Sequence, residues 1–346
     1  MSGADRQLHY THTRHPMGAE TIELAPGLLW ARFPLPFRLN HINVWLLRED
    51  DGWTLIDTAT TTREALDLWE ALLSGPLSGA PVRRLIATHG HTDHVGLAGW
   101  LVDRVGGVPF VATLAEWHSP QVRIIDAKQP MRPDTMRFLE SHGCDQPTVA
   151  AYAQDRAKTH ALLGPLPASF LRITDGETIR FGGRAWRVMV CGGHASEHAS
   201  FYCEEERILI AGDQVLSKIS PMIGVFPQEP WSDPLTEYLA SLDRFRVLPE
   251  DTLVLPSHGM PFRGLHVRVD QLADHHEARL DTLVGLMGRP EVAMTLARGL
   301  FPKAVDEGQG RHALAETLAH IHRLVTTGRA RRNESGGKLL FERTDR

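Results

Sequence analysis

The feature that most constrains this 346-residue chain is a cluster of ionisable side chains in residues 88–96, Thr-His-Gly-His-Thr-Asp-His-Val-Gly. It follows the apolar run RRLIATH (83–89), which predicts a strand, and precedes a segment with helical periodicity that runs to Val105. Three imidazoles and one carboxylate crowded together are unfavourable unless a cation holds them, so an ordinary set of surface or core histidines is disfavoured. These ligand types suit zinc, iron or manganese. The sequence therefore predicts a metal-binding loop at a strand–helix junction, able to serve two ions.

The spacing His-x-His-x-Asp-His resembles the signature of the metallo-β-lactamase superfamily, whose remaining ligands follow later strands. Candidates occur in that order at His194 after AWRVMVC (185–191), Asp213 after RILIAG (207–212) and His258 after TLVL (252–255). The resemblance covers about residues 20–262. It implies that one metal is held by His89, His91 and His194, that the other is held by Asp93, His94 and His258, and that Asp213 bridges the two.

The resemblance also implies an α/β fold, a four-layer αββα sandwich, with the catalytic domain at residues 19–265. Residues 119–170 interrupt the strand–helix alternation with helical stretches at 134–142 and 147–163, and we interpret them as a helical lid insertion. Residues 1–18, which include His9, His12 and His15, are polar and lack hydrophobic periodicity, so we expect a flexible tail.

The composition changes at about His266. Helical patterns at 266–287, 290–300 and 312–327 precede a hairpin-like end at 329–343, which together predict a winged-helix-like domain at 266–346. The whole chain resembles bacterial metallo-hydrolases with such a C-terminal domain, a branch that is itself similar to the glyoxalase II and lactamase-like endoribonuclease groups. The appendage could bind nucleic acid, pack on the catalytic domain or mediate a homodimer.

Several single residues keep two interpretations. Asp57 at a strand end could orient the ligand loop or cap a turn, and His198 could donate to a ligand or lie at a strand edge. Cys191 lies in an apolar run and is expected to be a packed thiol. Apolar walls for a substrate are expected at Phe33, Phe37, Met131 and Met136, although core packing explains the same residues equally well.

The expected chemistry is hydrolysis. Two divalent ions bridged by Asp213, zinc by default with iron or manganese as alternatives, would lower the pKa of a shared water and generate a bridging hydroxide. Asp93 would both ligate and assist proton transfer as the catalytic residue. Subfamilies with a zinc-bound cysteine carry it where Asp213 stands, so that resistance-type activity is disfavoured. Lactone hydrolases often carry a tyrosine soon after this aspartate, and residues 214–218 contain none.

Charge favours a small ester, thioester or lactone over single-stranded RNA, the rival substrate. The net charge is −5, and residues 266–346 contain 13 Lys and Arg against 11 Asp and Glu, a balance of only +2. The basic run in that segment is Arg329, Arg331 and Arg332, which resembles a solvated face. We expect no membrane span and no secretory signal, and three cysteines at no metal-like spacing fit a reducing cytoplasm.

Overall fold

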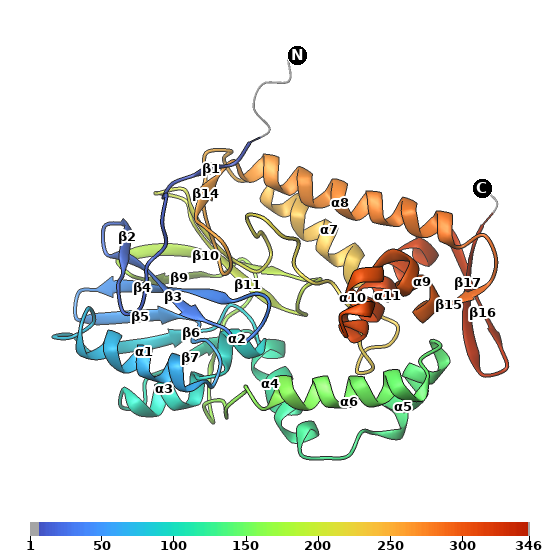
Figure 1. Ribbon diagram of the computed structural model, residues 1–346. Coiled ribbons are helices and arrows are strands. Elements are labelled where there is room, and N and C mark those ends of the chain that lie inside the picture. Colours follow the sequence, from blue (N-terminus) through green and yellow to red (C-terminus); the bar gives the residue numbers. More distant parts are fainter. Residues whose placement is uncertain (1–6, 345–346) are drawn as a thin grey trace, which may run out of the picture.

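Two seven-stranded sheets form the centre of the computed structural model, which describes residues 7–344 (Figure 1). The first sheet has the strand order β2 (Ile22–Ala25), β3 (Leu28–Pro34), β4 (His41–Glu49), β5 (Gly52–Ile56), β6 (Val82–Ile86), β7 (Phe110–Ala112) and β8 (Leu171–Arg172). The second has the order β1 (His9–Tyr10), β14 (Phe262–Arg263), β13 (Leu253–Pro256), β12 (Ile208–Gly212), β11 (His198–Cys203), β10 (Arg184–Cys191) and β9 (Thr178–Phe181).

The two sheets pack face to face through large side chains that alternate along the strands. Trp30 and Trp45 of the first sheet belong to the same buried cluster as Trp186 and Phe201 of the second. The next residue along β3, Ala31, belongs to a different cluster on the outer face of the first sheet. This alternation follows from the two-residue repeat of a strand and makes both faces of each sheet apolar.

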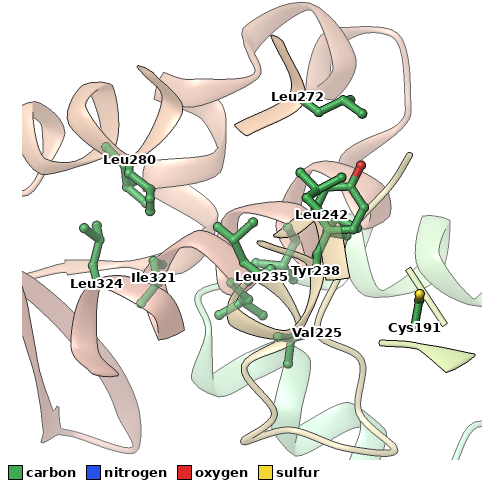
Figure 2. Packing of buried hydrophobic residues seen from close by; sticks show 14 of the residues in the cluster. Cys191, Val225, Leu235, Tyr238, Leu242, Leu272, Leu280, Ile321 and Leu324 are labelled. Atoms are coloured by element: carbon green, nitrogen blue, oxygen red, sulfur yellow. The ribbon is translucent and has the colours of Figure 1, made fainter. Parts of the chain in front are cut away.

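Helices cover both outer faces. The first sheet is covered by α1 (Arg63–Ser74), α3 (Ala98–Arg104) and α4 (Leu114–Ala127), which bury residues such as Trp69 and Leu101 against it. The second is covered by α7 (Pro234–Phe245) and α8 (Leu265–Leu286), whose Leu235 and Leu272 join its outer cluster (Figure 2). The expected four-layer αββα sandwich is thereby confirmed.

Helices also occupy the segment interpreted as an insertion. They are α4, which begins earlier than expected, α5 (Pro133–Ser141) and α6 (Gln146–His160). Phe138 and Leu139 of α5 belong to the outer cluster of the second sheet, together with Phe341 near the C-terminus. The backbone NH of Met294 donates to the carbonyl of His142 over 2.9 Å. The insertion is therefore attached to the C-terminal part of the chain.

The C-terminal part has the helix and hairpin order expected from the sequence, with one addition. After α8 come β15 (Glu291–Val292), α9 (Ala293–Leu300), the unexpected short helix α10 (Pro302–Asp306), α11 (Gly310–Thr326), and the hairpin of β16 (Ala330–Ser335) and β17 (Lys338–Arg343). Leu280, Ile321 and Leu324 share one buried cluster with Leu235 and Tyr238 of α7 (Figure 2). This part therefore packs directly on the αββα sandwich.

Two residues of the segment that was expected to be a flexible tail form a strand. His9 and Tyr10 form β1, which pairs antiparallel with Arg263 and Phe262 of β14, because this edge of the second sheet offers free backbone groups. Residues 1–6 of the tail lie outside the described residues. Among residues 7–344, no helix is both long enough and apolar enough to cross a membrane.

Candidate metal centre

Four loops meet at one edge of the sandwich. The loop 87–91 follows β6 and leads into α2 (Thr92–Val95), His194 lies between β10 and β11, Asp213 follows β12, and His258 follows β13. Strands β5 and β6 are parallel, as are β12 and β13, so their carboxyl ends lie on the same side. Hydrogen bonds join the sheets here, from Ala199 N to Thr88 O over 2.7 Å and from Asn43 N to Ser257 O over 2.7 Å.

The predicted ligands converge as these loops meet. His89 Nε2 lies 2.9 Å from His91 Nδ1 and 3.2 Å from His194 Nε2. His258 Nε2 lies 3.4 Å from an Asp93 oxygen and 3.4 Å from an Asp213 oxygen. Asp213 faces both groups, with Oδ2 3.3 Å from His194 Nε2 and Oδ1 3.5 Å from His94 Nε2.

These side chains fit metal ions. Among residues 7–344, three sets have ligand atoms within 4.8 Å of one another, namely His89, His91 and His194, then His89, His94 and Asp213, then Asp93, His94 and His258. His94 Nε2, Asp213 Oδ1 and His258 Nε2 are buried without a hydrogen-bond partner. Buried polar atoms normally have partners, so these three indicate a cation at their meeting point. Imidazole and carboxylate donors suit zinc, iron and manganese.

Burial and neighbouring charges determine the protonation states of His89, His91 and Asp213. Burial and neighbouring histidines hold the pKa of His89 and of His91 well below the usual range, so both are neutral and able to ligate. Burial alone would raise the pKa of Asp213, but His258 and His94 outweigh it and hold that pKa well below its usual value. Asp213 is therefore an ionised carboxylate at the centre of the cluster.

Asp57, predicted to orient the ligand loop or to cap a turn, contacts the ring of His94. Its carboxylate is fully buried, accepts a hydrogen bond from Thr88 N over 2.9 Å and lies 2.8 Å from His94 Nδ1. Its backbone adopts a φ of 65°, a left-handed conformation that aspartate tolerates better than most residues. These contacts support the orienting interpretation rather than a simple turn cap.

His198 supports Asp213 through the backbone. Its Nε2 accepts a hydrogen bond from Asp213 N over 3.0 Å, and its ring stacks on His89 with a centroid separation of 4.8 Å. Gly212 makes this approach possible, because a Cβ there would lie 2.3 Å from His198 Nε2. His198 is thus buried against the cluster and is not a strand-edge histidine on the surface.

Glu116, which the sequence does not single out, connects two ligand loops through hydrogen bonds. Its carboxylate is buried and accepts hydrogen bonds from Gly90 N over 2.7 Å and from Glu197 N over 2.8 Å. Gly90 lies between His89 and His91, while Glu197 lies in the loop of His194. The chain separation of these groups is too large for a local motif, so only the fold identifies this residue.

A cavity of about 1280 Å³ opens onto the cluster. Of the predicted substrate walls, Phe37 lines it, as do His91, Asp93 and His194. Phe33 does not, because it is fully buried and packs on Trp69 of α1 at a centroid distance of 4.8 Å.

The two methionines are also absent from the cavity lining. Met131 packs against the outer cluster of the second sheet, and Met136 is exposed on α5. The prediction of substrate contacts was therefore wrong for Phe33, Met131 and Met136. The cavity is instead lined by polar residues of α4, α6 and α11, among them Arg123, Arg156 and Arg311.

Comparison with known proteins identifies two regions of the chain. Residues 38–258 match the family described as the Metallo-beta-lactamase superfamily, and residues 280–344 match the family described as Metallo-beta-lactamase-like, C-terminal domain. A beta-lactamase domain protein from Burkholderia ambifaria has a similar structure, with a TM-score of 0.88 and 35% identity over 99% of both chains. A metallo-beta-lactamase family protein from Thermus thermophilus gives a TM-score of 0.77 and 32% identity, covering 93% of this chain and 100% of that one.

Curated relatives are more distant. The probable metallo-hydrolase YqjP of Bacillus subtilis (strain 168) is 26% identical over 84% of this chain and 89% of its own. The atrochrysone carboxyl ACP thioesterase of Aspergillus fumigatus is 24% identical over 72% of this chain and 44% of its own. The hydroxyacylglutathione hydrolase of Synechococcus sp. (strain JA-3-3Ab) is 29% identical over 38% and 52%, respectively.

Proposed function

Because the chain belongs to the metallo-beta-lactamase superfamily and is a metal-dependent hydrolase, we propose that it uses two divalent metal ions to hydrolyse a small acyl substrate. The observation that carries the proposal is the convergence of seven candidate ligand side chains beside one cavity, which His91, Asp93 and His194 line. Within residues 7–344, three buried ligand atoms of this cluster have no hydrogen-bond partner. On the division that the family resemblance implies, His89, His91 and His194 would hold one ion, Asp93, His94 and His258 would hold the other, and Asp213 would serve both. Zinc suits this donor set first, with iron and manganese as alternatives.

The metals, when bound, supply a water nucleophile at neutral pH and polarise the substrate carbonyl. The protein's own side chains hold the candidate metal ligands in position. Asp57 and His198 fix the orientation of His94 and Asp213, and Glu116 holds the two histidine loops together. Asp93 lines the cavity, so its carboxylate is placed to accept a proton from the attacking water and to pass it towards the leaving group.

Among small acyl compounds, we favour a thioester over an ester or a lactone. Two of the relatives bear names that state action on an acyl–thiol conjugate, the thioesterase and the hydroxyacylglutathione hydrolase. The cavity volume suits a small molecule. Buried, free Cys144, Cys191 and Cys203 are consistent with a reducing compartment such as the cytoplasm.

RNA is disfavoured as a substrate because Arg329, Arg331 and Arg332, the basic run of the C-terminal domain, already contact other side chains of the protein. Arg329 forms ion pairs with Glu277 and Asp281, at 2.8 and 2.6 Å, and Arg331 pairs with Glu342 at 2.7 Å. The guanidinium of Arg332 lies over the Trp231 ring at 4.3 Å. Acidic neighbours therefore neutralise most of the charge that a phosphate backbone would need.

The decisive experiment is a side-by-side turnover assay of the metal-loaded protein on acyl thioesters, aryl esters, lactones and single-stranded RNA. We expect the thioester to have the highest kcat/KM and Asp213→Ala to abolish its turnover. RNA cleavage that exceeds every acyl substrate and disappears in Asp213→Ala would overturn the proposal.

A further inference from the structure

Three arginines from separate helices line the cavity near the candidate metal centre. They are Arg123 of α4, Arg156 of α6 and Arg311 of α11. Two of them have a carboxylate partner, because Arg156 pairs with Asp126 at 2.6 Å and Arg311 pairs with Asp155 at 3.3 Å. The charge of these two guanidinium groups is therefore compensated within the protein.

Arg123 is different. Its Nη2 donates to the carbonyl of Gly90 and to Ser119 Oγ, both over 2.9 Å. Its Nε and Nη1 have no hydrogen-bond partner among residues 7–344, and no carboxylate oxygen of those residues lies within 4.0 Å of the guanidinium. The nearby Glu116 is committed to two backbone NH groups.

The surroundings make this positive charge costly. Burial lowers the pKa of Arg123 and Arg311 lowers it further, while the charges of Glu116 and Asp93 act in the opposite direction, and the guanidinium stays charged at neutral pH. His160 lines the same cavity, and burial and the three arginines lower its pKa to about 4, so its ring is neutral at neutral pH and adds no charge of its own. A half-buried guanidinium that has no carboxylate in direct ion-pair contact is stabilised when an anion enters the cavity and binds its free edge.

The position of Arg123 also matters. The carbonyl that it contacts belongs to Gly90, between His89 and His91, and Asp93 and His91 line the same cavity. An anion bound to the free edge of the guanidinium would therefore lie beside the reacting end of an acyl substrate.

We propose that Arg123 binds an anionic group of the substrate, so that this hydrolase prefers acyl compounds carrying a carboxylate or similar anion close to the scissile bond. The inference deepens the proposed function and rests on it. The anion could belong to the acyl part or to the thiol part, and the two sources have the same chemistry at Arg123.

The test uses pairs of thioesters that differ in charge but hardly in shape. On the acyl side, succinyl and 4-methylpentanoyl thioesters of N-acetylcysteamine are compared. On the thiol side, butyryl thioesters of 3-mercaptopropionate and 3-methylbutane-1-thiol are compared. Each pair is assayed with zinc-loaded wild type, Arg123→Gln, Arg123→Lys and the control Arg137→Gln, whose arginine is exposed on α5 outside the cavity lining.

We expect wild type to prefer the charged member of one pair, and Arg123→Gln to reduce that preference at least about tenfold, as the loss of a charge-assisted hydrogen bond would. In Arg123→Gln the neutral member should lose less turnover than the charged member, Arg123→Lys should retain part of the preference, and Arg137→Gln should behave as wild type. An equal loss for both members would show that Arg123 only positions the loop of Gly90, and would overturn the inference. So would the absence of a charge preference in wild type.

A binding measurement keeps this inference separate from the proposed function. If no thioester is turned over, calorimetry with succinate and 4-methylpentanoate on the zinc-loaded protein still tests the anion site. Tighter binding of succinate that is lost in Arg123→Gln would support the site although the thioesterase proposal had failed. If Arg123→Gln still bound succinate more tightly than 4-methylpentanoate by the same factor as wild type, the proposed anion site would be overturned.

Discussion

At the scale of single residues, the candidate ligands are fixed by contacts on the far side of their rings. His94 Nδ1 lies 2.8 Å from Asp57, His258 Nδ1 lies 2.7 Å from the carbonyl of His41, and His194 Nδ1 lies 2.9 Å from the carbonyl of Met222. Each contact fixes the tautomer, because a ring that donates through Nδ1 presents the Nε2 lone pair to a metal. The chain therefore presents preoriented ligand atoms.

The Asp57 carboxylate can be tested with a change that keeps its shape. Asp57→Asn should weaken metal binding or activity about 10- to 100-fold, because it removes the charge that orients His94. Asparagine tolerates the left-handed backbone, so the protein should stay folded. Metal titrations of Asp57→Asn and of the exposed control Asp67→Asn measure the effect. Equal metal affinity in all three proteins would contradict the orienting role.

Gly212 permits a second test with a matched control. Gly212 and Gly336 have φ values of 56° and 55°, but a Cβ would meet His198 Nε2 at 2.3 Å in the first and nothing within 4 Å in the second. Both alanine variants should lose about 1 kcal/mol to the positive φ. Gly212→Ala should lose more in chemical denaturation and should also bind metal poorly. If both alanine variants lost the same free energy of unfolding, the close approach of His198 to Gly212 would be unimportant.

At the scale of elements, the sequence predicted structure well wherever a short local pattern decided it. The ligand loop was found because four ionisable residues fall within six positions after an apolar run, and the hairpin of β16 and β17 because turn glycines separate two strand-like segments. The predictions failed where the structure of a segment depends on a partner that is distant in the sequence. The two-residue strand β1 exists only because β14 is there to pair with it.

The substrate wall was mispredicted for the same reason. Phe33 and Phe37 lie four residues apart in an apolar loop, but β3 continues through Phe33 and turns it towards α1, whereas Phe37 lies past the strand end. Arg123 and Glu116 look like ordinary polar positions of an amphipathic helix. Their contacts with Gly90 are set by how α4 packs on the first sheet, which no spacing along the chain reveals.

Helices α8 and α11 meet at a buried histidine pair, which predicts a pH dependence. His276 Nδ1 lies 3.2 Å from His320 Nε2, and both side chains are fully buried. Burial, then His320 and His275, lowers the pKa of His276, and burial lowers that of His320 to about 4. Unfolded histidines titrate near about 6.5. Between about pH 6.5 and 4 the unfolded chain thus binds protons that the folded chain does not, and stability falls as the pH falls.

Replacing His276 should flatten that dependence. Denaturation of chelator-treated wild type and His276→Gln from pH 7.5 to 4.5 should show a slope for wild type that is steeper by about 1 kcal/mol per pH unit below pH 6.5. Chelator treatment removes metal loss as a cause in both proteins. Parallel curves would mean that His276 does not titrate in this window.

At the scale of the whole molecule, one buried cluster joins the catalytic sandwich to the C-terminal helices. It contains Leu209 of β12 and Leu235 of α7 as well as Leu318 of α11. The cavity is shared in the same way, because Arg311 of α11 lines it together with Asp93. Folding of the two parts is therefore expected to be cooperative, and the C-terminal domain takes part in shaping the site.

A core truncation tests this cooperativity. Leu318→Ala removes a fully buried side chain at the junction and should cost about 2–5 kcal/mol. Calorimetry should show one unfolding transition in both proteins, shifted to lower temperature in the variant. Two separate transitions, with only one of them shifted, would show that the C-terminal domain unfolds independently.

The most direct test of the central claim, a two-metal hydrolytic centre, is reconstitution of the metal-free protein. Apoprotein is titrated with zinc or manganese while bound metal, by elemental analysis, and thioester turnover are followed together. We predict that activity rises with binding and levels off at about two ions per chain, one for the set of His89, His91 and His194 and one for the set of Asp93, His94 and His258. Asp213→Ala should reach neither that stoichiometry nor that activity. Full turnover by a folded protein that binds no metal would contradict the account.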